Sequence, residues 1–391
     1  MAFTRRSLLR GAIGGAGLAL SAPFLRPLRL LAADAAPALG PADENGVRLL
    51  PGYTSRIVAR AGQPPFPGGA HAWVASPDGG AVFPAPGGGW IYVANSELPA
   101  GQGGTAALRF DAQGAVVDAY PILTGTSINC GGGATPWGTW LSCEEFPLGQ
   151  VWECDPTGAA AAVARPALGV FTHEAVAVDP LSERLYLTED APYGRFYRFT
   201  PKTVPTAGTW DLSAGTLEAA QVHEGSNGVS GPVTWLPVAD PAATKVPLFK
   251  QVPASTAFPG AEGIAARDGI VYFTTKYDSR VWAYDTKHES IDLLYDARRF
   301  AEPVLTGVDN VAITPGGAVL VAEDGGDMQL VVVVPGGAVY PIAQVVGHIG
   351  SELAGPAFDP SGTRLYFSSQ RGPGGQLSDG ITYEIRGPFA G

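Results

Sequence analysis

The chain has 391 residues, including 53 glycines and 35 prolines, and 46% of its residues are hydrophobic. This composition favours many short strands joined by tight turns, and it excludes a long disordered chain. The formal net charge is −11, which disfavours binding to a polyanion, so we expect no nucleic-acid partner.

The N-terminal segment has the features of a twin-arginine export signal. Arg5 and Arg6 precede two leucines, and an uncharged stretch of 15 residues runs from Gly11 to Leu25. Small residues from Ala33 to Ala36 offer a cleavage site. The apolar stretch is shorter than the ~20 residues of a membrane-spanning helix. We therefore expect residues 1–36 to be a cleaved signal peptide with no stable membrane anchor, and the mature protein to be periplasmic or secreted.

Short apolar runs of strand length recur along the remaining chain. In chain order they include GGWIYVANSE, TWLSCEE, GQVWECDPTG, RLYLTED, GRFYRFTP, GIVYFTTKYD, SRVWAYDT, GAVLVAED and TRLYFSSQ. Each run is rich in Val, Tyr, Trp or Phe and is bounded by Gly, Pro or Asp, as β-strands are. Residues 37–391 are therefore predicted to form one all-β domain.

Four of these runs belong to an internal repeat that places an acid before two strands. The acids are Glu174, Glu262, Asp309 and Glu352, separated by 88, 47 and 43 residues, and Cys130 lies 44 residues before the first. A period of about 40–50 residues with several strands per unit is typical of a β-propeller. We predict a single propeller of six blades, with seven as the alternative. Residues 203–253 are poorly patterned, and they hold either a further blade or an insertion.

The repeat predicts a metal site on the channel axis. The innermost strand of every blade lines this axis, so equivalent residues should form a ring at one mouth of the channel. The second strands also end in acids, which are Glu144, Glu145, Glu189, Asp190, Glu323 and Asp324. Crowded carboxylates must either take up protons or bind cations. Because all of these donors are oxygens, they favour Ca²⁺.

The segment GTSINCGGGATPWGTWLSCEE, from Gly125 to Glu145, allows several interpretations. It lacks the Gly-Lys-Ser/Thr ending of a phosphate-binding loop. Its glycines suit a tight turn. Cys130 and Cys143 could form a disulfide, or Cys143 and Cys154 could be small core residues. Since Cys130 follows the spacing of the acids, its thiolate could also be a soft ligand that favours iron beside Ca²⁺.

These motifs together resemble the PhoX family of secreted, calcium- and iron-dependent alkaline phosphatases. The resemblance rests on NCGGGATPWGTWLSCEE, FTHEAVAVDP, LYLTED, AEGI, GVDNVAI, VAEDGG and SELAGPAFDPSGTRLYFSSQ, and it extends from about Gly79 to Gly372. It implies a β-propeller exported by the twin-arginine translocase, with Fe³⁺ and Ca²⁺ on the channel axis.

The resemblance also implies roles for individual residues. Cys130 and Glu145 would bind iron, and Glu174 and Glu262 would bind or bridge metals. The remaining members of the main set would be Asp309, Glu323 and Glu352, with Glu144, Glu189, Asp190 and Asp324 as further calcium candidates. No catalytic residue beyond the metal ligands is implied.

One departure from the family pattern concerns phosphate recognition. The larger family members place an arginine near the Glu-Gly motif, whereas this chain has Phe258-Pro259-Gly260-Ala261-Glu262 there. Lys276, Arg195 or Arg371 could substitute for that arginine.

We therefore expect a monomeric, exported phosphatase that hydrolyses small phosphate esters through an Fe³⁺/Ca²⁺ cluster. One alternative is a calcium-dependent propeller lactonase, for which Asn95, Asn129 and Asn310 would supply amide ligands. The other is a non-catalytic binding propeller in which calcium only braces the blades.

Overall fold

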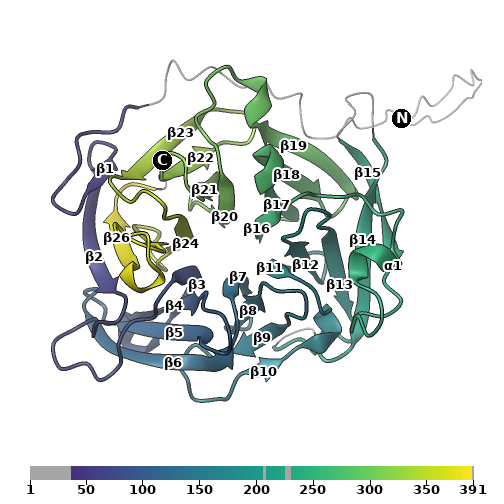
Figure 1. Cartoon of the computed structure of the whole chain (residues 1–391), viewed down its shortest axis with the longest axis horizontal. Helices are drawn as coiled ribbons and strands as arrows, with labels where there is room; N and C mark the ends of the chain where they lie inside the picture. The colour runs from purple at the N-terminus through teal and green to yellow at the C-terminus, as the bar shows by residue number, and fades with distance from the viewer. Residues whose placement is uncertain (1–36, 206–207, 225–229, 390–391) are drawn as a thin grey trace, which may run out of the picture.

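The computed structural model describes residues 37–205, 208–224 and 230–389, so the predicted export signal lies outside the described residues. Viewed down its shortest axis, the molecule is a ring of antiparallel sheets around a central channel (Figure 1). None of the described helices has the length and apolar character that a membrane-spanning helix needs. The prediction of an all-β, propeller-like fold is confirmed.

Six strands of the described residues line the channel, and each contacts the next around the ring. These inner strands are β3 (Pro77–Pro84), β7 (Asn129–Ala134), β11 (His173–Asp179), β16 (Ala261–Arg267), β20 (Val308–Ile313) and β24 (Leu353–Phe358).

Each inner strand continues outward through three antiparallel partners. The second strands are β4 (Trp90–Ser96), β8 (Trp140–Glu144), β12 (Arg184–Glu189), β17 (Ile270–Thr275), β21 (Val319–Glu323) and β25 (Arg364–Ser369). The third strands are β5 (Gly103–Phe110), β9 (Val151–Cys154), β13 (Phe196–Pro201), β18 (Arg280–Asp285), β22 (Gln329–Val333) and β26 (Ile381–Arg386). The outer strands are β6 (Val116–Thr126), β10 (Val163–Ala164), β14 (Gly215–Val222), β19 (Ser290–Asp296), β23 (Val339–Val345) and β2 (Thr54–Arg60).

The poorly patterned segment holds an outer strand and an insertion instead of a further set of four strands. β14 completes one sheet, and β15 (Gly231–Pro237) joins it edge to edge with β19, which merges two neighbouring sets into a nine-stranded sheet. The short helix α1 (Leu248–Gln251) follows. The described 3₁₀ turns are η2 (Pro86–Gly88), η3 (Pro166–Leu168), η4 (Lys276–Asp278), η5 (Ala297–Arg299) and η6 (Leu377–Asp379).

Apolar side chains fill the space between each pair of neighbouring sheets. One such cluster packs Leu353 and Phe367 of the last sheet against Leu320 and Leu330 of the sheet before it. Equivalent clusters separate the other neighbours around the ring. Each strand between two such layers has both of its faces buried, and its sequence is therefore a continuous apolar run.

The N-terminal strands close the ring. β2 pairs with β26, which is the last strand in the sequence, and β1 (Val47–Leu49) pairs with β23 in the neighbouring sheet. The two ends of the folded chain are thus held together by backbone hydrogen bonds, and the inner strands are fixed around one axis.

Candidate metal centre

Five inner strands carry a potential ligand at their second residue, at the same mouth of the channel. These residues are Asp78, Cys130, Glu174, Glu262 and Asp309. In β11, His173 pairs with Glu189 and Val176 pairs with Leu187, so Glu174 lies in a bulge between two paired positions. The other four strands have the same register shift. A bulge redirects a side chain, and here it brings side chains from different sheets together.

The structure gathers these residues and three further acids, Glu97, Glu145 and Glu352, into three groups. Within each group, the potential ligand atoms lie within 4.8 Å of one another. The groups are Glu174, Glu262 and Asp309; Glu97, Cys130 and Glu145; and Asp78, Glu97 and Glu352. Together they supply seven carboxylates and one thiol.

The carboxylate of Glu174 gives the best test of whether this centre fits a cation. Its side chain is fully buried, and neither of its oxygens has a hydrogen-bond partner among the described residues. A buried carboxylate without partners is strongly unfavourable. Glu262 and Asp309 lie beside it and add oxygen donors. Such an oxygen-rich set fits a hard cation, and the thiol of Cys130 adds a donor that suits iron.

Burial and mutual repulsion raise the pKa values of the whole centre. Burial, followed by the charges of Glu262 and Glu145, raises the pKa of Glu174 well above its usual value. Burial also raises the pKa of Asp309 to about 7. For Cys130, burial and then Asp78 and Glu174 raise the thiol pKa. Protons and cations therefore compete for these groups, and cation binding would release protons.

Two basic side chains stand at the rim of this centre. Lys276 Nζ lies 2.8 Å from Glu262, 3.4 Å from Asp324 and 3.9 Å from Asp190. Burial would lower the pKa of Lys276, but the charges of Glu262 and Asp309 outweigh it and raise the pKa. Arg371 Nη2 lies 3.1 Å from Glu352. Both side chains are about one-third exposed, at 30% and 31%, so a ligand can reach them.

Arg195 is placed differently from these two. It is buried and donates hydrogen bonds to Ser255 Oγ and to the carbonyl oxygens of Tyr193 and Gly194. Of the three basic residues named from the sequence, only Lys276 and Arg371 therefore reach the centre.

Three predicted ligands turn away from the channel and serve the local backbone. Glu144 accepts hydrogen bonds from the backbone N–H groups of Ser127 and Gln150. Glu323 accepts from the backbone of Thr306 and Gln329 in the same way.

The carboxylate of Glu189 is engaged similarly, by the backbone N–H of Arg195 and the hydroxyl of Tyr197. We therefore remove Glu144, Glu189 and Glu323 from the ligand set. Adjacent residues of a strand point to opposite sides. Of the second acids, Glu145 belongs to a ligand group, whereas Asp190 and Asp324 lie beside Lys276 at the rim and outside the three groups.

The repeat also assigned Glu352 to the wrong register. Leu353 pairs with Ser369, the last residue of β25, and Val308 likewise pairs with Glu323, the last residue of β21. Leu353 is therefore equivalent to Val308, and the next residue, Ala354, is equivalent to Asp309. Glu352 still reaches the centre, but from just before β24.

Sequence reasoning missed three members of the centre. Asp78 lies 52 residues before Cys130, outside the expected spacing. Glu97 ends the run GGWIYVANSE as Glu145 ends TWLSCEE, and this likeness could have revealed it. Gln370 Nε2 donates to the carboxylate of Asp78 and, over 2.8 Å, to Glu97 Oε2, which ties the first sheet to the last.

The structure also tests the interpretations of the segment from Gly125 to Glu145. Cys130, Cys143 and Cys154 are all free and buried, so the predicted disulfide alternative is wrong. The glycines after Cys130 allow β7 to approach β11 closely, because a Cβ added at Gly131 would lie 2.6 Å from the carbonyl oxygen of Glu174.

The asparagines that a lactonase-type site would need are engaged elsewhere. Asn95 donates to the carbonyl oxygens of Cys130 and Gly131. Asn129 hydrogen-bonds with Thr126 and Ser142. Their amides hold the inner strands in place and are not available as metal ligands.

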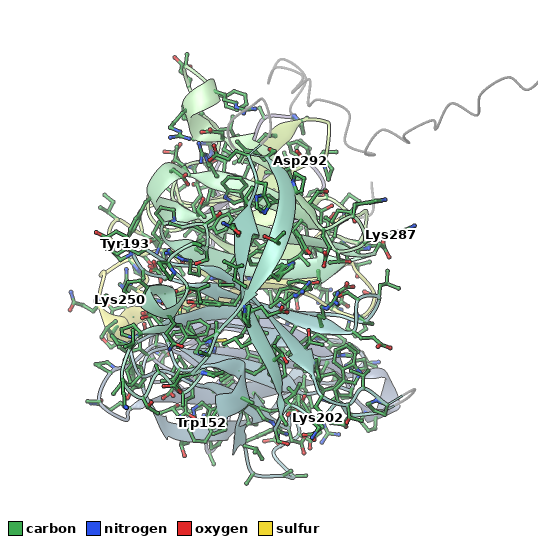
Figure 2. The ribbon with its side chains drawn as sticks, turned by 90° about the vertical axis from the view of Figure 1, so that its right-hand side faces the viewer. Trp152, Tyr193, Lys202, Lys250, Lys287 and Asp292 are labelled. Carbon is green, nitrogen blue, oxygen red and sulfur yellow. The ribbon has the colours of Figure 1, made fainter. Side chains whose placement is uncertain are left out.

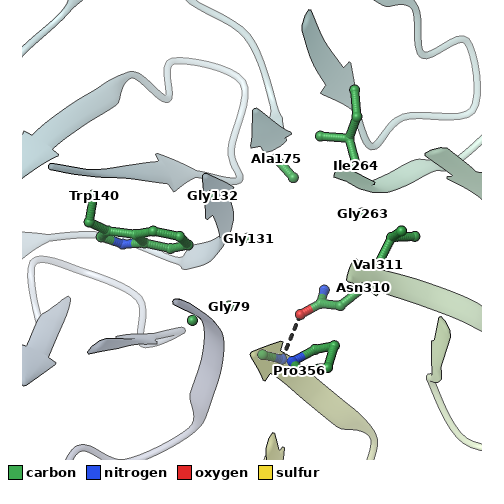
Figure 3. Close-up of a pocket in the computed structure, with 12 residues that line it drawn as sticks. Gly79, Gly131, Gly132, Trp140, Ala175, Gly263, Ile264, Asn310, Val311 and Pro356 are labelled. Atoms are coloured by element: carbon green, nitrogen blue, oxygen red, sulfur yellow. Dashed lines mark hydrogen bonds between the residues drawn. The ribbon is translucent and has the colours of Figure 1, made fainter. Parts of the chain in front are cut away.

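Behind the ring of ligands, small residues constrict the channel. Figure 3 shows Gly79, Gly131 and Gly263 around a small cavity, with Asn310 reaching across it. The amide oxygen of Asn310 accepts a 2.7 Å hydrogen bond from the backbone N–H of Gly355. The close packing of backbone here leaves a cavity of only about 30 Å³ behind the ligands.

The fold and the site define the class of this protein, which is a propeller-like protein with an acidic centre on its axis. Comparison with known proteins gives its family. The model of the family "Alkaline phosphatase PhoX" matches residues 96–148 and 146–288. The chain belongs to this PhoX family, whose members are phosphoric ester hydrolases.

Two solved structures show how similar the fold is. One is Pseudomonas fluorescens PhoX in complex with vanadate, a transition state analogue. It matches with a TM-score of 0.75 at 17% identity, over 91% of this chain and 98% of that chain. The other is a protein of unknown function from Bacteroides thetaiotaomicron, with a TM-score of 0.52 at 11% identity, over 89% of this chain and 84% of that chain. No curated protein matches the sequence.

Proposed function

We propose that this protein is an exported phosphatase that hydrolyses phosphate esters at a cluster of Fe³⁺ and Ca²⁺ ions on the axis of a six-bladed propeller. The observation that carries the proposal is the convergence of seven carboxylates and the Cys130 thiol at one mouth of the channel, in a chain that belongs to a phosphoric ester hydrolase family.

The donor chemistry suggests how the ions are distributed. Glu97, Cys130 and Glu145 form the one group with a thiol and would hold iron. The two groups of oxygen donors, which contain Glu174 and Glu352 respectively, would hold calcium and complete the cluster. When bound, the cations offset the acids and stabilise the negative charge that develops on the transferred phosphoryl group.

The chain's own contribution is to bind and orient the ester. Lys276 and Arg371, as positive groups at the rim, would donate hydrogen bonds to the phosphoryl oxygens and so replace the arginine that is absent near Glu262. The cavity behind the ring has a volume of only about 30 Å³, which is too small for the organic part of an ester, so this part must point toward solvent or toward the rim.

Metal removal tests the proposal directly. We expect the purified protein to contain iron and calcium by elemental analysis and to hydrolyse 4-nitrophenyl phosphate. A chelator should abolish this activity and lower the melting temperature. A ligand present at a free concentration of about 1,000 times its Kd stabilises the folded state by about 4 kcal/mol, and the chelator removes this stabilisation. Vanadate, a transition state analogue for the Pseudomonas fluorescens relative, should inhibit hydrolysis.

Each alternative predicts a different outcome. Full activity in excess chelator would refute the metal-dependent mechanism. A single divalent cation without iron, together with lactone hydrolysis, would favour a lactonase. Bound calcium with no turnover of any ester would favour a binding propeller.

Export through the twin-arginine translocase is part of the same proposal, and it rests on Arg5 and Arg6. Replacing both by lysine should leave the protein in the cytoplasm. Unchanged export of this variant would contradict the proposed route.

A further inference from the structure

We propose that a cavity beside the metal centre binds the apolar, aromatic group of the ester, so that the preferred substrates are phosphate monoesters of aromatic alcohols. This inference rests on the proposed phosphatase function and adds the substrate class. The cavity has a volume of about 500 Å³, which lies in the range of small-molecule sites.

Apolar side chains from four segments form the walls of this cavity. Leu148 comes from the segment after β8, Phe171 from the segment before β11, and Pro192 from the segment after β12. Leu248 and Phe249 come from α1 and complete the enclosure. The Phe249 ring stacks on Tyr193, with 6.1 Å between the ring centroids. This arrangement presents flat apolar surface of the kind that binds an aromatic ring.

Two lining residues place the cavity next to the metal centre. Asp190 lines the cavity and also lies 3.9 Å from Lys276 Nζ at the rim. Thr172, another lining residue, is bridged by backbone hydrogen bonding to Glu145, a member of the ligand groups. An ester whose phosphoryl group lies at the centre can therefore direct its organic group into the cavity.

Charge decides which part of the substrate the cavity accepts. Its charged lining residues are Glu189 and Asp190, and no basic side chain lines it among the described residues. It therefore repels a second phosphate or a carboxylate and accepts a neutral group. This property disfavours nucleoside polyphosphates and favours a neutral aromatic alcohol as the leaving group.

The test compares two esters and a binding probe. The pocket variant is Leu148→Ser with Phe249→Ser, and the matched control is Leu181→Ser. Leu181 is exposed like Leu148, at 73% and 68%. It lies in the turn between β11 and β12, near Gly269. Tyr193 and Lys250 are the sequence neighbours of the lining residues Pro192 and Phe249. They lie on the opposite side of the molecule from Lys287 (Figure 2).

We expect the pocket variant to lose at least about tenfold in kcat/KM for 2-naphthyl phosphate, mainly through KM, because each methylene in an apolar pocket changes this ratio about 10- to 200-fold. Hydrolysis of glycerol phosphate should stay within about twofold of wild type. The control should match wild type for both esters.

Binding of free 2-naphthol, followed by its fluorescence, separates the two proposals. If neither ester is hydrolysed but naphthol binds the wild type more tightly than the pocket variant, the phosphatase proposal fails and the cavity assignment stands. Equal naphthol binding and equal kinetics in the wild type and the pocket variant would overturn the cavity assignment while leaving the phosphatase intact.

Discussion

The three ligand groups contain seven carboxylates and one soft donor, the thiol of Cys130. Substitution of Cys130 therefore distinguishes iron binding from calcium binding. We expect Cys130→Ser to lose iron and to retain calcium. Because even outer-shell changes cost about 10–100-fold in metal affinity or activity, loss of the thiol should lower phosphatase activity by at least about 100-fold. Elemental analysis and an aryl phosphate assay measure both effects.

The control for this prediction is Cys143→Ala, since Cys143 is also free and buried but belongs to an apolar cluster. It should keep normal iron content. Full iron occupancy in Cys130→Ser would remove Cys130 from the ligand set.

Lys276 is the basic residue that lies closest to the carboxylates of the centre, and it tests phosphate recognition. Lys276→Met should raise KM for 4-nitrophenyl phosphate by about tenfold, because a hydrogen bond to a charged group contributes about 1.5–3 kcal/mol. The metal content should be unchanged. Steady-state kinetics and elemental analysis check the two expectations.

Lys287→Met is the matched control, because Lys287 is exposed and lies on the opposite side of the molecule from Tyr193 and Lys250 (Figure 2). A Lys276 variant that loses metal together with activity would show that the lysine supports Glu262 instead of binding substrate.

At the scale of the strand, the register shift in the inner strands creates the site. Five inner strands place the ligand in the bulge, and the next residue is small or polar: Gly79, Gly131, Ala175, Gly263 and Asn310. The sequence shows the acid followed by a small residue, but a bulge depends on the pairing of two strands. The sequence alone therefore predicted the ring and could not predict the side-chain directions within it.

The same limit explains which residues of the centre the sequence could place. Hairpins of similar length give the separations of 44 and 47 residues between Cys130 and Glu174 and between Glu262 and Asp309. The 88 residues between Glu174 and Glu262 instead separate neighbouring inner strands, β11 and β16, because β15 and α1 lie between these two sets of strands. The longer connection between β3 and β7 hid Asp78, and one register difference in β24 displaced the assignment at Glu352. For Glu144 and Glu189, only the turn that follows each strand decides that a backbone N–H, and not the centre, receives the carboxylate.

The close approach of β7 and β11 predicts a large effect for a small substitution. A Cβ at Gly133 would lie 1.9 Å from the carbonyl oxygen of Val176, so backbone must shift to accommodate it. We expect Gly133→Ala to lower the free energy of unfolding by about 1–3 kcal/mol or more. Urea denaturation in saturating calcium measures this change.

Gly40→Ala serves as the control, because its added Cβ would lie 3.5 Å from the nearest atom, the carbonyl oxygen of Leu49. It should leave the free energy of unfolding nearly unchanged. Equal stability of the Gly133 and Gly40 variants would show that the inner strands can separate without cost.

At the scale of the whole molecule, the metal centre depends on closure of the ring. The ligands come from every sheet, so their mutual distances are fixed only when β2 pairs with β26. Arg56 of β2 lies directly opposite Glu384 of β26, and their side chains approach within 2.6 Å. Arg364 and Arg386 also contact Glu384, at 3.0 and 2.7 Å. This buried carboxylate with three arginines is thus a polar clamp on the closure.

The clamp predicts a specific dependence of stability on pH. Burial alone would raise the pKa of Glu384, but hydrogen bonds from Arg56, Arg386 and Tyr366 outweigh it and hold the pKa below its usual value of 4.5. Since the folded-state pKa is lower than the unfolded one, the unfolded state binds more protons as the pH falls. The stabilisation by Glu384 is therefore present above about pH 4.5 and is lost as the pH falls through the folded-state pKa.

Glu384→Gln cannot titrate, so it isolates this contribution. Above pH 5, the variant should be less stable than wild type by about 1–3 kcal/mol, and the difference should shrink as the pH falls below about 4. The carboxylates of the metal centre also take up protons as the pH falls, but they do so in both proteins, so the difference between the two denaturation curves reports Glu384 alone. Glu44→Gln, at an exposed glutamate of the N-terminal segment, should follow wild type at every pH. A Glu384 variant whose stability stays parallel to wild type from pH 7 to pH 3 would show that ring closure does not depend on this charge.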